Sequence, residues 1–237
     1  MTKITIYNEF YHEQTEEKVR EVYPQGIHGA LADFLRSDEN EVRCFTLETV
    51  EEITDEVLDD TDVMLWWGHL RHSAVPDEVA QRVRNAVLKG MGIIFLHSGH
   101  HSKPFRLLMG TSCDVSWRED GDMERLWNIC PSHPIMRGIG RYFELEHEET
   151  YSEPFTLPEP DQVLMIGWYE GGEVFRSACT FHRENGRIFY FQPGHETFPI
   201  FYDPNVQTVI KNAVEWVKPT YRVEKLYSPH IKKIGEE

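Results

Sequence analysis

The sequence is short of basic residues. Its 237 residues include 24 Lys and Arg against 40 Asp and Glu, which gives a formal net charge of −16. Nucleic acids and anionic membranes are bound through basic surface patches, so this balance argues against either as the main partner. We expect most of the acidic side chains to form a solvated surface.

Long apolar segments and paired cysteines are also missing. No stretch approaches the roughly 18 apolar residues that a membrane span needs, and the N-terminal sequence MTKITIYNEF does not contain the apolar core of a signal peptide. The four cysteines are scattered without a C-x-x-C pair, which disfavours a disulfide framework or a cysteine zinc site. These absences predict a cytoplasmic protein with reduced thiols.

What the sequence does contain is a helix, a buried strand and a histidine-rich turn in direct succession. Valines at every fourth position of 79–87, followed by Gly90, are typical of an amphipathic helix closed by a glycine cap. The apolar run 93–96 indicates a strand buried on both faces, and it ends in HSGHH at residues 97–101. In open α/β sheets, ligands bind beside the carboxyl ends of such strands, so we expect chemistry at this turn.

Strands and helices alternate along the first half of the chain, which predicts a mostly parallel sheet with right-handed crossovers. The strands predicted there lie at residues 3–8, 41–47, 62–67 and 93–96. A polar loop is expected before the first helix, whose buried stripe contains Ile27, Leu31 and Leu35. In the second half, Asn185-Gly186 predicts a hairpin. That half adds antiparallel or extended segments at residues 124–131, 142–151, 163–168, 173–182 and 187–192.

Chain length and the last helix define the expected domain. A chain of 237 residues can bury a substantial core as one α/β domain. The apolar pattern over 206–217 predicts a closing helix. We therefore expect a single domain over residues 1–218 and a polar tail over 219–237. Aromatic residues in the second half allow a homo-oligomer interface, although core packing is their more usual role.

Histidine is abundant, with 12 residues, and it gathers at the predicted strand ends. Neutral imidazoles bind zinc and similar divalent metals, and a catalytic zinc site usually has three protein ligands. The sequence has no H-E-x-x-H motif, so spacing does not fix the ligands. The residues predicted to hold a metal are His28, His69 and His72. No nucleotide cofactor is expected.

Acid–base chemistry without a metal is the alternative for the same part of the chain. His97 or His195 can act as a general base near an unperturbed pKa of about 6.5, with Glu149 or Glu196 as the acid or the orienting group. Ser98 is a candidate nucleophile beside an imidazole, although a serine there also suits ligand binding or a helix cap.

Aromatic side chains suggest the kind of ligand. Most tryptophans are expected in the core, but Trp67 stands at a strand exit beside Gly68, where it can form the floor of a sugar site. Aromatic faces near carboxylates and imidazoles suit polyhydroxylated ligands, which need stacking and many hydrogen bonds. The residues predicted to contact substrate are Trp67, Tyr151, Glu196, Glu9 and His12.

Five longer segments carry a family resemblance. They are WWGH (66–69), GMGIIFLHSGHHSKPF (90–105), PSHPI (131–135), EETYSEPF (148–155) and GRIFYFQPGHE (186–196). Together they resemble the trehalose-utilisation, ThuA-like family, over nearly all of residues 3–217. The resemblance implies the class I glutamine amidotransferase-like fold, a flavodoxin-like three-layer α/β sandwich, in agreement with the mostly parallel sheet predicted above.

The chain departs from the amidotransferases at the turn after the central strand. Those enzymes carry a nucleophilic cysteine there, whereas this chain has His97-Ser98-Gly99, and His195 is followed directly by Glu196. Glutamine hydrolysis through a thioester is therefore not expected. The resemblance implies a role in sugar catabolism, but a likeness of fold does not supply the reaction.

Two functions with a small sugar as ligand remain open, and a third option, a metal-dependent hydrolase of an unrelated small molecule, differs from the first of them only in substrate. The first is a hydrolase or isomerase that acts on trehalose or an oxidised disaccharide derivative, through histidine and glutamate acid–base chemistry with or without a metal. The second is a non-catalytic sugar-binding or assembly protein on the same fold, which the missing cysteine favours.

Overall fold

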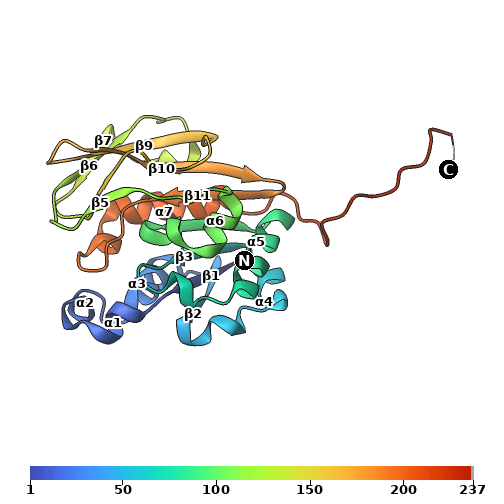
Figure 1. Cartoon of the computed structure of the whole chain (residues 1–237), viewed down its shortest axis with the longest axis horizontal. Helices are drawn as coiled ribbons and strands as arrows, with labels where there is room; N and C mark the ends of the chain where they lie inside the picture. Colours follow the sequence, from blue (N-terminus) through green and yellow to red (C-terminus); the bar gives the residue numbers. More distant parts are fainter. Residues whose placement is uncertain (236–237) are drawn as a thin grey trace.

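A nine-stranded mixed sheet forms the centre of the fold in the computed structural model, which describes residues 1–235. The strand order is β2-β1-β3-β4-β11-β10-β9-β6-β7 (Figure 1). Adjacent strands from β2 to β11 in this order run parallel to each other. These five strands are β1 (Thr2–Asn8), β2 (Asn40–Thr46), β3 (Val63–Trp67), β4 (Gly92–Leu96) and β11 (Gly186–Phe191). The antiparallel strands are β6 (Glu124–Asn128), β7 (Tyr142–Leu145), β9 (Gln162–Tyr169) and β10 (Val174–Arg183). A separate antiparallel pair contains β5 (Ser116–Arg118) and β8 (Thr150–Ser152).

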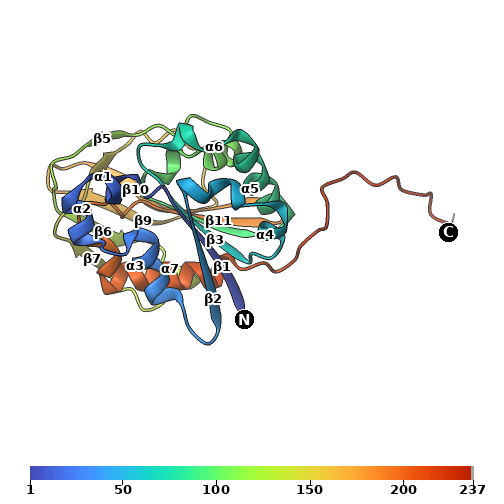
Figure 2. The same ribbon diagram turned by 90° about the horizontal axis from the view of Figure 1, so that it is seen from below.

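Helices cover both faces of the parallel strands and complete a three-layer sandwich (Figure 1, Figure 2). One apolar core lies between the sheet and the helices α3 (Gly26–Leu35) and α7 (Pro204–Val217). The opposite core lies under α4 (Asp55–Asp59), α5 (Asp77–Lys89) and α6 (Lys103–Met109). The fold class predicted from the sequence, a mostly parallel α/β sandwich with antiparallel additions, is confirmed.

The central strand β4 shows why the fold places chemistry at its end. All of its residues are buried, and alternate side chains enter the two cores: Ile94 and Leu96 face one, Ile93 and Phe95 the other. Helix α5 stops just before it at Gly90, whose φ of 125° suits glycine. A strand with no exposed face leaves only its carboxyl end open to a ligand.

The predicted polar loop after β1 is wrong. Two short helices occupy it, α1 (Tyr11–Thr15) and α2 (Glu17–Val22). Each is less than two turns long, and Val19 is the only fully buried apolar residue in them. Helices this short do not produce the repeating apolar pattern from which helices are predicted.

The segment predicted as extended over 142–151 is two separate strands. Strand β7 pairs with β6 in the main sheet, whereas β8 pairs with β5 in the small one. The chain turns between them because the Glu148 carboxylate is buried and binds backbone N–H groups of the loop after β11. Residue alternation alone does not reveal such a long-range contact.

The predicted hairpin joins β10 and β11, with a turn one residue earlier than the Asn-Gly pair suggests. Arg183 pairs with Gly186, so the turn residues are Glu184, at a φ of 48°, and Asn185. Gly186 is required by packing, since a Cβ there would lie 2.1 Å from the Val87 carbonyl oxygen of α5.

The segment predicted as a polar tail begins with contacts to the domain. Arg222 Nη1 donates to the Asp59 carbonyl at 2.9 Å, and the Val223 N–H donates to the Lys89 carbonyl at 3.0 Å. Residues 224–235 are exposed and extend away from the domain (Figure 1, Figure 2). Within residues 1–235, no helix combines the length and apolar character needed to span a bilayer.

Candidate functional site

The candidate site lies beyond the carboxyl ends of the parallel strands. Loops that follow β1, β3, β4 and β11 bring in histidines, and the loop before β8 adds a carboxylate. Four of these side chains have ligand-type atoms within 4.8 Å of one another: His69, His97, Glu149 and His195. Four loops that are far apart in the sequence therefore converge on one polar centre.

His97 occupies the turn directly after β4 in a left-handed conformation, with a φ of 52°. Such a φ is uncommon for a residue with a Cβ, and it often marks a functional site. The Nδ1 atom lies 3.0 Å from the carbonyl oxygen of Gln192, the residue after β11. Because a carbonyl only accepts, Nδ1 carries the hydrogen, and Nε2 is left facing Oε2 of Glu149 at 3.0 Å.

His69 and His195 contact polar groups through the same ring nitrogen. Nδ1 of His69 lies 3.0 Å from the Glu196 carboxylate, which can only accept while it is ionised. Nδ1 of His195 lies 2.8 Å from the Thr197 hydroxyl, which can accept, and 3.3 Å from the Thr197 N–H. The three rings of His69, His97 and His195 surround one point, with centroids 5.5–5.6 Å apart.

Polar atoms at this point are buried without a hydrogen-bond partner among residues 1–235. They are Nε2 of His97, Nε2 of His195 and Oε2 of Glu149. The 3.0 Å contact of His97 with Glu149 does not meet hydrogen-bond geometry, and it sets a lone pair against a carboxylate. An unsatisfied buried polar group costs about 1–3 kcal/mol, so the arrangement needs a cation or protons at its centre.

Two buried carboxylates hold the loops that carry these residues. Glu9 accepts hydrogen bonds from the backbone N–H groups of residues 69, 70 and 71, at 2.7–3.0 Å. Glu148 accepts from the backbone N–H groups of residues 149, 194 and 195, at 2.8–3.1 Å. Glu9 therefore shapes the loop of His69, and Glu148 ties the Glu149 loop to the His195 loop.

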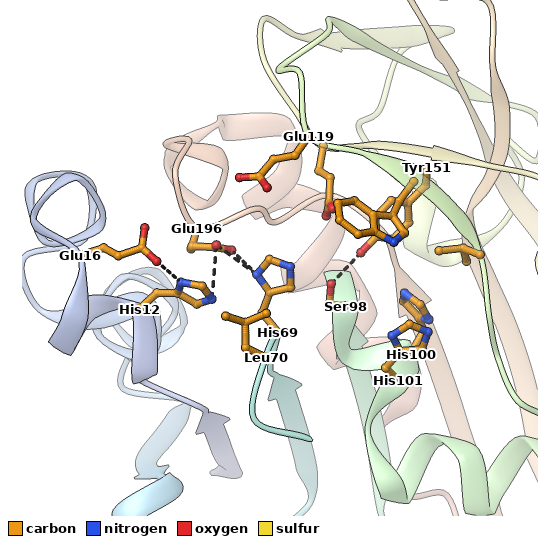
Figure 3. Close-up of a pocket in the computed structure, with 13 residues that line it drawn as sticks. His12, Glu16, His69, Leu70, Ser98, His100, His101, Glu119, Tyr151 and Glu196 are labelled. Carbon is orange, nitrogen blue, oxygen red and sulfur yellow. Dashed lines mark hydrogen bonds and ion pairs between the residues drawn. The ribbon is translucent and has the colours of Figure 1, made fainter. Parts of the chain in front are cut away.

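A cavity of about 380 Å³ opens from this centre to solvent (Figure 3). His69 and Glu149 of the polar centre face it, and so does Glu196, which contacts His69. Figure 3 shows His12 and His69 on either side of Glu196, and the Ser98 hydroxyl bonded to the Tyr151 hydroxyl, with a separation of 2.7 Å. The other lining residues are Glu16, Leu70, His100, His101, Val115, Trp117 and Glu119.

Burial and the neighbouring carboxylates act on the site histidines in opposite directions. Burial lowers the pKa of His195 to about 4. Burial also disfavours charge on His69, but the hydrogen bond and charge of Glu196 outweigh it and raise the His69 pKa to about 9. In Glu196 the same contact overcomes burial and depresses the pKa well below its usual range. The cavity wall thus holds a carboxylate–imidazolium pair, and a neutral imidazole lies behind it.

Six of the residues predicted for the site do not line the cavity, and of these only His97 and His195 belong to the polar centre behind it. Trp67 is completely buried, and its indole N–H donates to the Gly194 carbonyl at 3.0 Å. His28 lies 3.0 Å from the Asn8 amide, and the His72 ring packs near His101. Glu9, described above, binds backbone instead. Of the predicted metal set His28, His69 and His72, only His69 belongs to the polar centre.

Seven of the cavity residues were not predicted for the site from the sequence, among them Trp117 and Glu119. Trp117 is 61% exposed and lies in β5, a strand of three residues. A strand this short carries no alternation, and its partner β8 is distant in sequence. The single available signal was an isolated tryptophan in a charged segment.

A mostly parallel sheet with helices on both faces and a polar site at its strand ends is the fold of class I glutamine amidotransferase-like α/β proteins. The chain belongs to the trehalose-utilisation (ThuA) family, whose sequence profile, described as trehalose utilisation, matches residues 3–217. No curated protein matches the chain.

Solved structures share this fold at low sequence identity. A protein described as ThuA-like from Parabacteroides merdae has 16% identity and a TM-score of 0.69, over 94% of this chain and 92% of that chain. A Salmonella typhimurium protein described as cytoplasmic has 13% identity and a TM-score of 0.62, over 92% of this chain and 100% of that chain. A glutamine amidotransferase from Thermotoga maritima has 10% identity and a TM-score of 0.57, over 91% of this chain and 97% of that chain.

Proposed function

We propose that this protein is a cytoplasmic sugar-processing enzyme, a hydrolase or isomerase that acts on trehalose or an oxidised disaccharide derivative. The cavity carries the proposal, because it combines the exposed indole of Trp117 with carboxylates, imidazoles and a hydroxyl pair. Such a lining suits a polyhydroxylated ring, which stacks on an aromatic face and makes many hydrogen bonds. Membership of the trehalose-utilisation family supports the sugar class.

Glu196 is the group best placed to support proton transfer. It lines the cavity, with its carboxylate 3.0 Å from Nδ1 of His69 and 3.5 Å from Nε2 of His12. Because its depressed pKa keeps Glu196 ionised, it orients these two imidazoles, and a cavity-lining imidazole held in this way can exchange a proton with a substrate. The hydroxyls of Ser98 and Tyr151 are available to orient sugar hydroxyls.

The side chains of His97 and His195 lie behind the residues that line the cavity. Both are 0% exposed and neither lines the cavity, so they do not touch a substrate in this arrangement. We propose that they position Glu149, which does line the cavity. Alanine at either histidine should abolish turnover while unfolding stays cooperative.

The test is turnover of trehalose and of its oxidised derivatives, followed by NMR of the sugar signals. We expect Glu196→Gln to lower kcat by about 100-fold or more, because the imidazole that acts as general acid or base loses its orienting carboxylate. Trp117→Ala should raise KM roughly tenfold through lost stacking, with little effect on stability because the side chain is exposed. Glu146→Gln, at a glutamate that is 92% exposed, is the matched control.

A different result of these experiments would identify a second function. Saturable sugar binding without any product, unchanged by Glu196→Gln except in affinity, would identify a non-catalytic sugar-binding protein. That second function is favoured by one observation, the lack of a cysteine in the turn after β4, residues 97–101.

A further inference from the structure

We propose that the polar centre behind the cavity binds one divalent metal ion of the zinc class through three imidazoles and one carboxylate. The ligands are His69, His97, Glu149 and His195. This set shares only His69 with the ligands expected from the sequence. The proposal stands on the geometry of these side chains and does not depend on which substrate the cavity takes.

The spacing of the four groups suits one ion. Their ligand atoms lie within 4.8 Å of one another, and the three imidazole centroids form a nearly equilateral triangle with sides of 5.5–5.6 Å. Imidazoles bound to one tetrahedral ion through bonds of about 2.0–2.1 Å have centroids about 5 Å apart. Shifts of a few tenths of an ångström therefore bring these rings into bonding distance.

The nitrogen that each ring offers follows from its outer contact. His97 gives the Nδ1 hydrogen to the Gln192 carbonyl, so its lone pair is on Nε2. His69 gives its Nδ1 hydrogen to the Glu196 carboxylate, so a metal ion would bind at Nε2 and displace the proton there. Nδ1 of His195 accepts from the Thr197 N–H at 3.3 Å, so this ring offers Nε2 to a metal only in the tautomer whose Nδ1 hydrogen is donated to the Thr197 hydroxyl, 2.8 Å away. A carbonyl, a carboxylate or a hydroxyl on the outer nitrogen is the usual support of a metal-bound histidine.

The unsatisfied atoms point to the same occupant. Nε2 of His97, Nε2 of His195 and Oε2 of Glu149 have no hydrogen-bond partner within the described chain, and all three are buried at the centre. A cation there would take lone pairs from every one of them. Protons alone would have to charge buried imidazoles that lie close together, which repel each other.

The types of ligand atom indicate which metal ions the site would bind. Three imidazole nitrogens with one carboxylate oxygen suit zinc and neighbouring divalent transition metals, whereas magnesium and calcium prefer oxygen ligands alone. His69 and Glu149 also face the cavity, so the ion would lie at its inner wall. Glu196 is then the supporting carboxylate of a ligand as well as a cavity residue.

The experiment is metal analysis of untagged protein purified without chelator, followed by removal of metal and titration with Zn²⁺ and Co²⁺. We expect about one ion per chain, and a Co²⁺ absorption spectrum with nitrogen and oxygen ligands. X-ray absorption of the zinc form should show three imidazoles at about 2.0–2.1 Å. Because it uses the wild-type chain, this measurement does not depend on whether a variant folds.

Variants of the proposed ligands test which residues bind the ion. Glu149→Gln and His97→Asn, the latter tolerant of the left-handed backbone, should weaken binding by about 100-fold or more, and Glu196→Gln by about 10–100-fold. His28→Ala and His72→Ala are the controls and should bind as wild type does, with far-ultraviolet circular dichroism to show that each chain is folded. No saturable binding of Zn²⁺ or Co²⁺, or binding unchanged in both Glu149→Gln and His97→Asn, would overturn the proposal.

Discussion

Glu124 is a single residue whose charge state contributes to the way stability varies with pH. It is the first residue of β6 and is 0% exposed, and its carboxyl accepts a hydrogen bond from the Ser177 hydroxyl at 2.9 Å. Burial raises its pKa from 4.5 to about 8, against hydrogen bonds from Ser177 and Tyr169 that lower it. Between these two pH values the folded protein keeps a proton that the unfolded chain releases.

We predict that this residue makes the folded state progressively less stable as pH rises from 4.5 to 8. The unfolded chain binds fewer protons in that window, so the free energy of unfolding falls by about 1.4 kcal/mol per pH unit from this group. Glu124→Gln removes the effect. Urea unfolding measures the free energy of unfolding of both proteins at about pH 5.5 and 7.5. The difference, variant minus wild type, should be roughly 2–3 kcal/mol larger at the higher pH. A difference between the two proteins that stays constant with pH would contradict the prediction.

Single residues also show what the sequence can reveal about the site. His97 and His195 were predicted for it because each follows a strand that the apolar pattern locates. Trp67 was assigned to substrate because it ends a strand, yet β3 is buried on both faces and no position in it is exposed. The exposed aromatic is Trp117, whose place beside the cavity depends on pairing between β5 and β8. No local pattern contains that pairing.

At the scale of elements, the loop between β7 and β8 is fixed by Glu148. Its buried carboxylate accepts hydrogen bonds from three backbone N–H groups, two of them in the loop after β11. One side chain therefore sets the positions of Glu149 and His195 relative to each other. The loop has no helix or strand of its own to do this.

We predict that Glu148→Ala destabilises the fold by about 2–4 kcal/mol, because several buried N–H groups lose their acceptor. Chemical denaturation measures the loss, and Glu144→Ala at a half-exposed glutamate of β7 serves as control. The variant should also bind Zn²⁺ more weakly than wild type, since two proposed ligands lose their alignment. A destabilisation no larger than that of Glu144→Ala would show that the loop is held by other contacts.

Elements were predictable from the sequence where the apolar pattern is long. Helices α5 and α7 and strand β4 were located within a few residues, because each has a buried stripe or run of its own. Helices α1 and α2 were missed, since they carry too few buried side chains to show a period. The order of strands in the sheet depends on contacts between distant segments, and sequence reasoning reached it only as far as a parallel half and an antiparallel half.

For the whole molecule, the boundary of the folded unit is set by residues 219–223. Arg222 and Val223 make hydrogen bonds to the ends of α4 and α5, whereas residues 224–235 are exposed. A chain ending at residue 223 should unfold at the temperature of the full chain. One ending at residue 218 should lose about 1–3 kcal/mol of stability, from the hydrogen bonds removed. Differential scanning calorimetry distinguishes the two, and equal melting temperatures for both shortened chains would place the boundary earlier.

The position of β11 beside β4 has a consequence for synthesis of the protein. The two strands are neighbours in the sheet, yet 89 residues of chain separate the end of β4 at Leu96 from the start of β11 at Gly186. Until β11 has left the ribosome, the apolar strand β4 has an unpaired edge, which is a template for pairing with another chain. His195 follows β11, so the polar centre is completed only after this edge is closed. Nascent or stalled chains are therefore the form of this protein most exposed to aggregation and most in need of a chaperone.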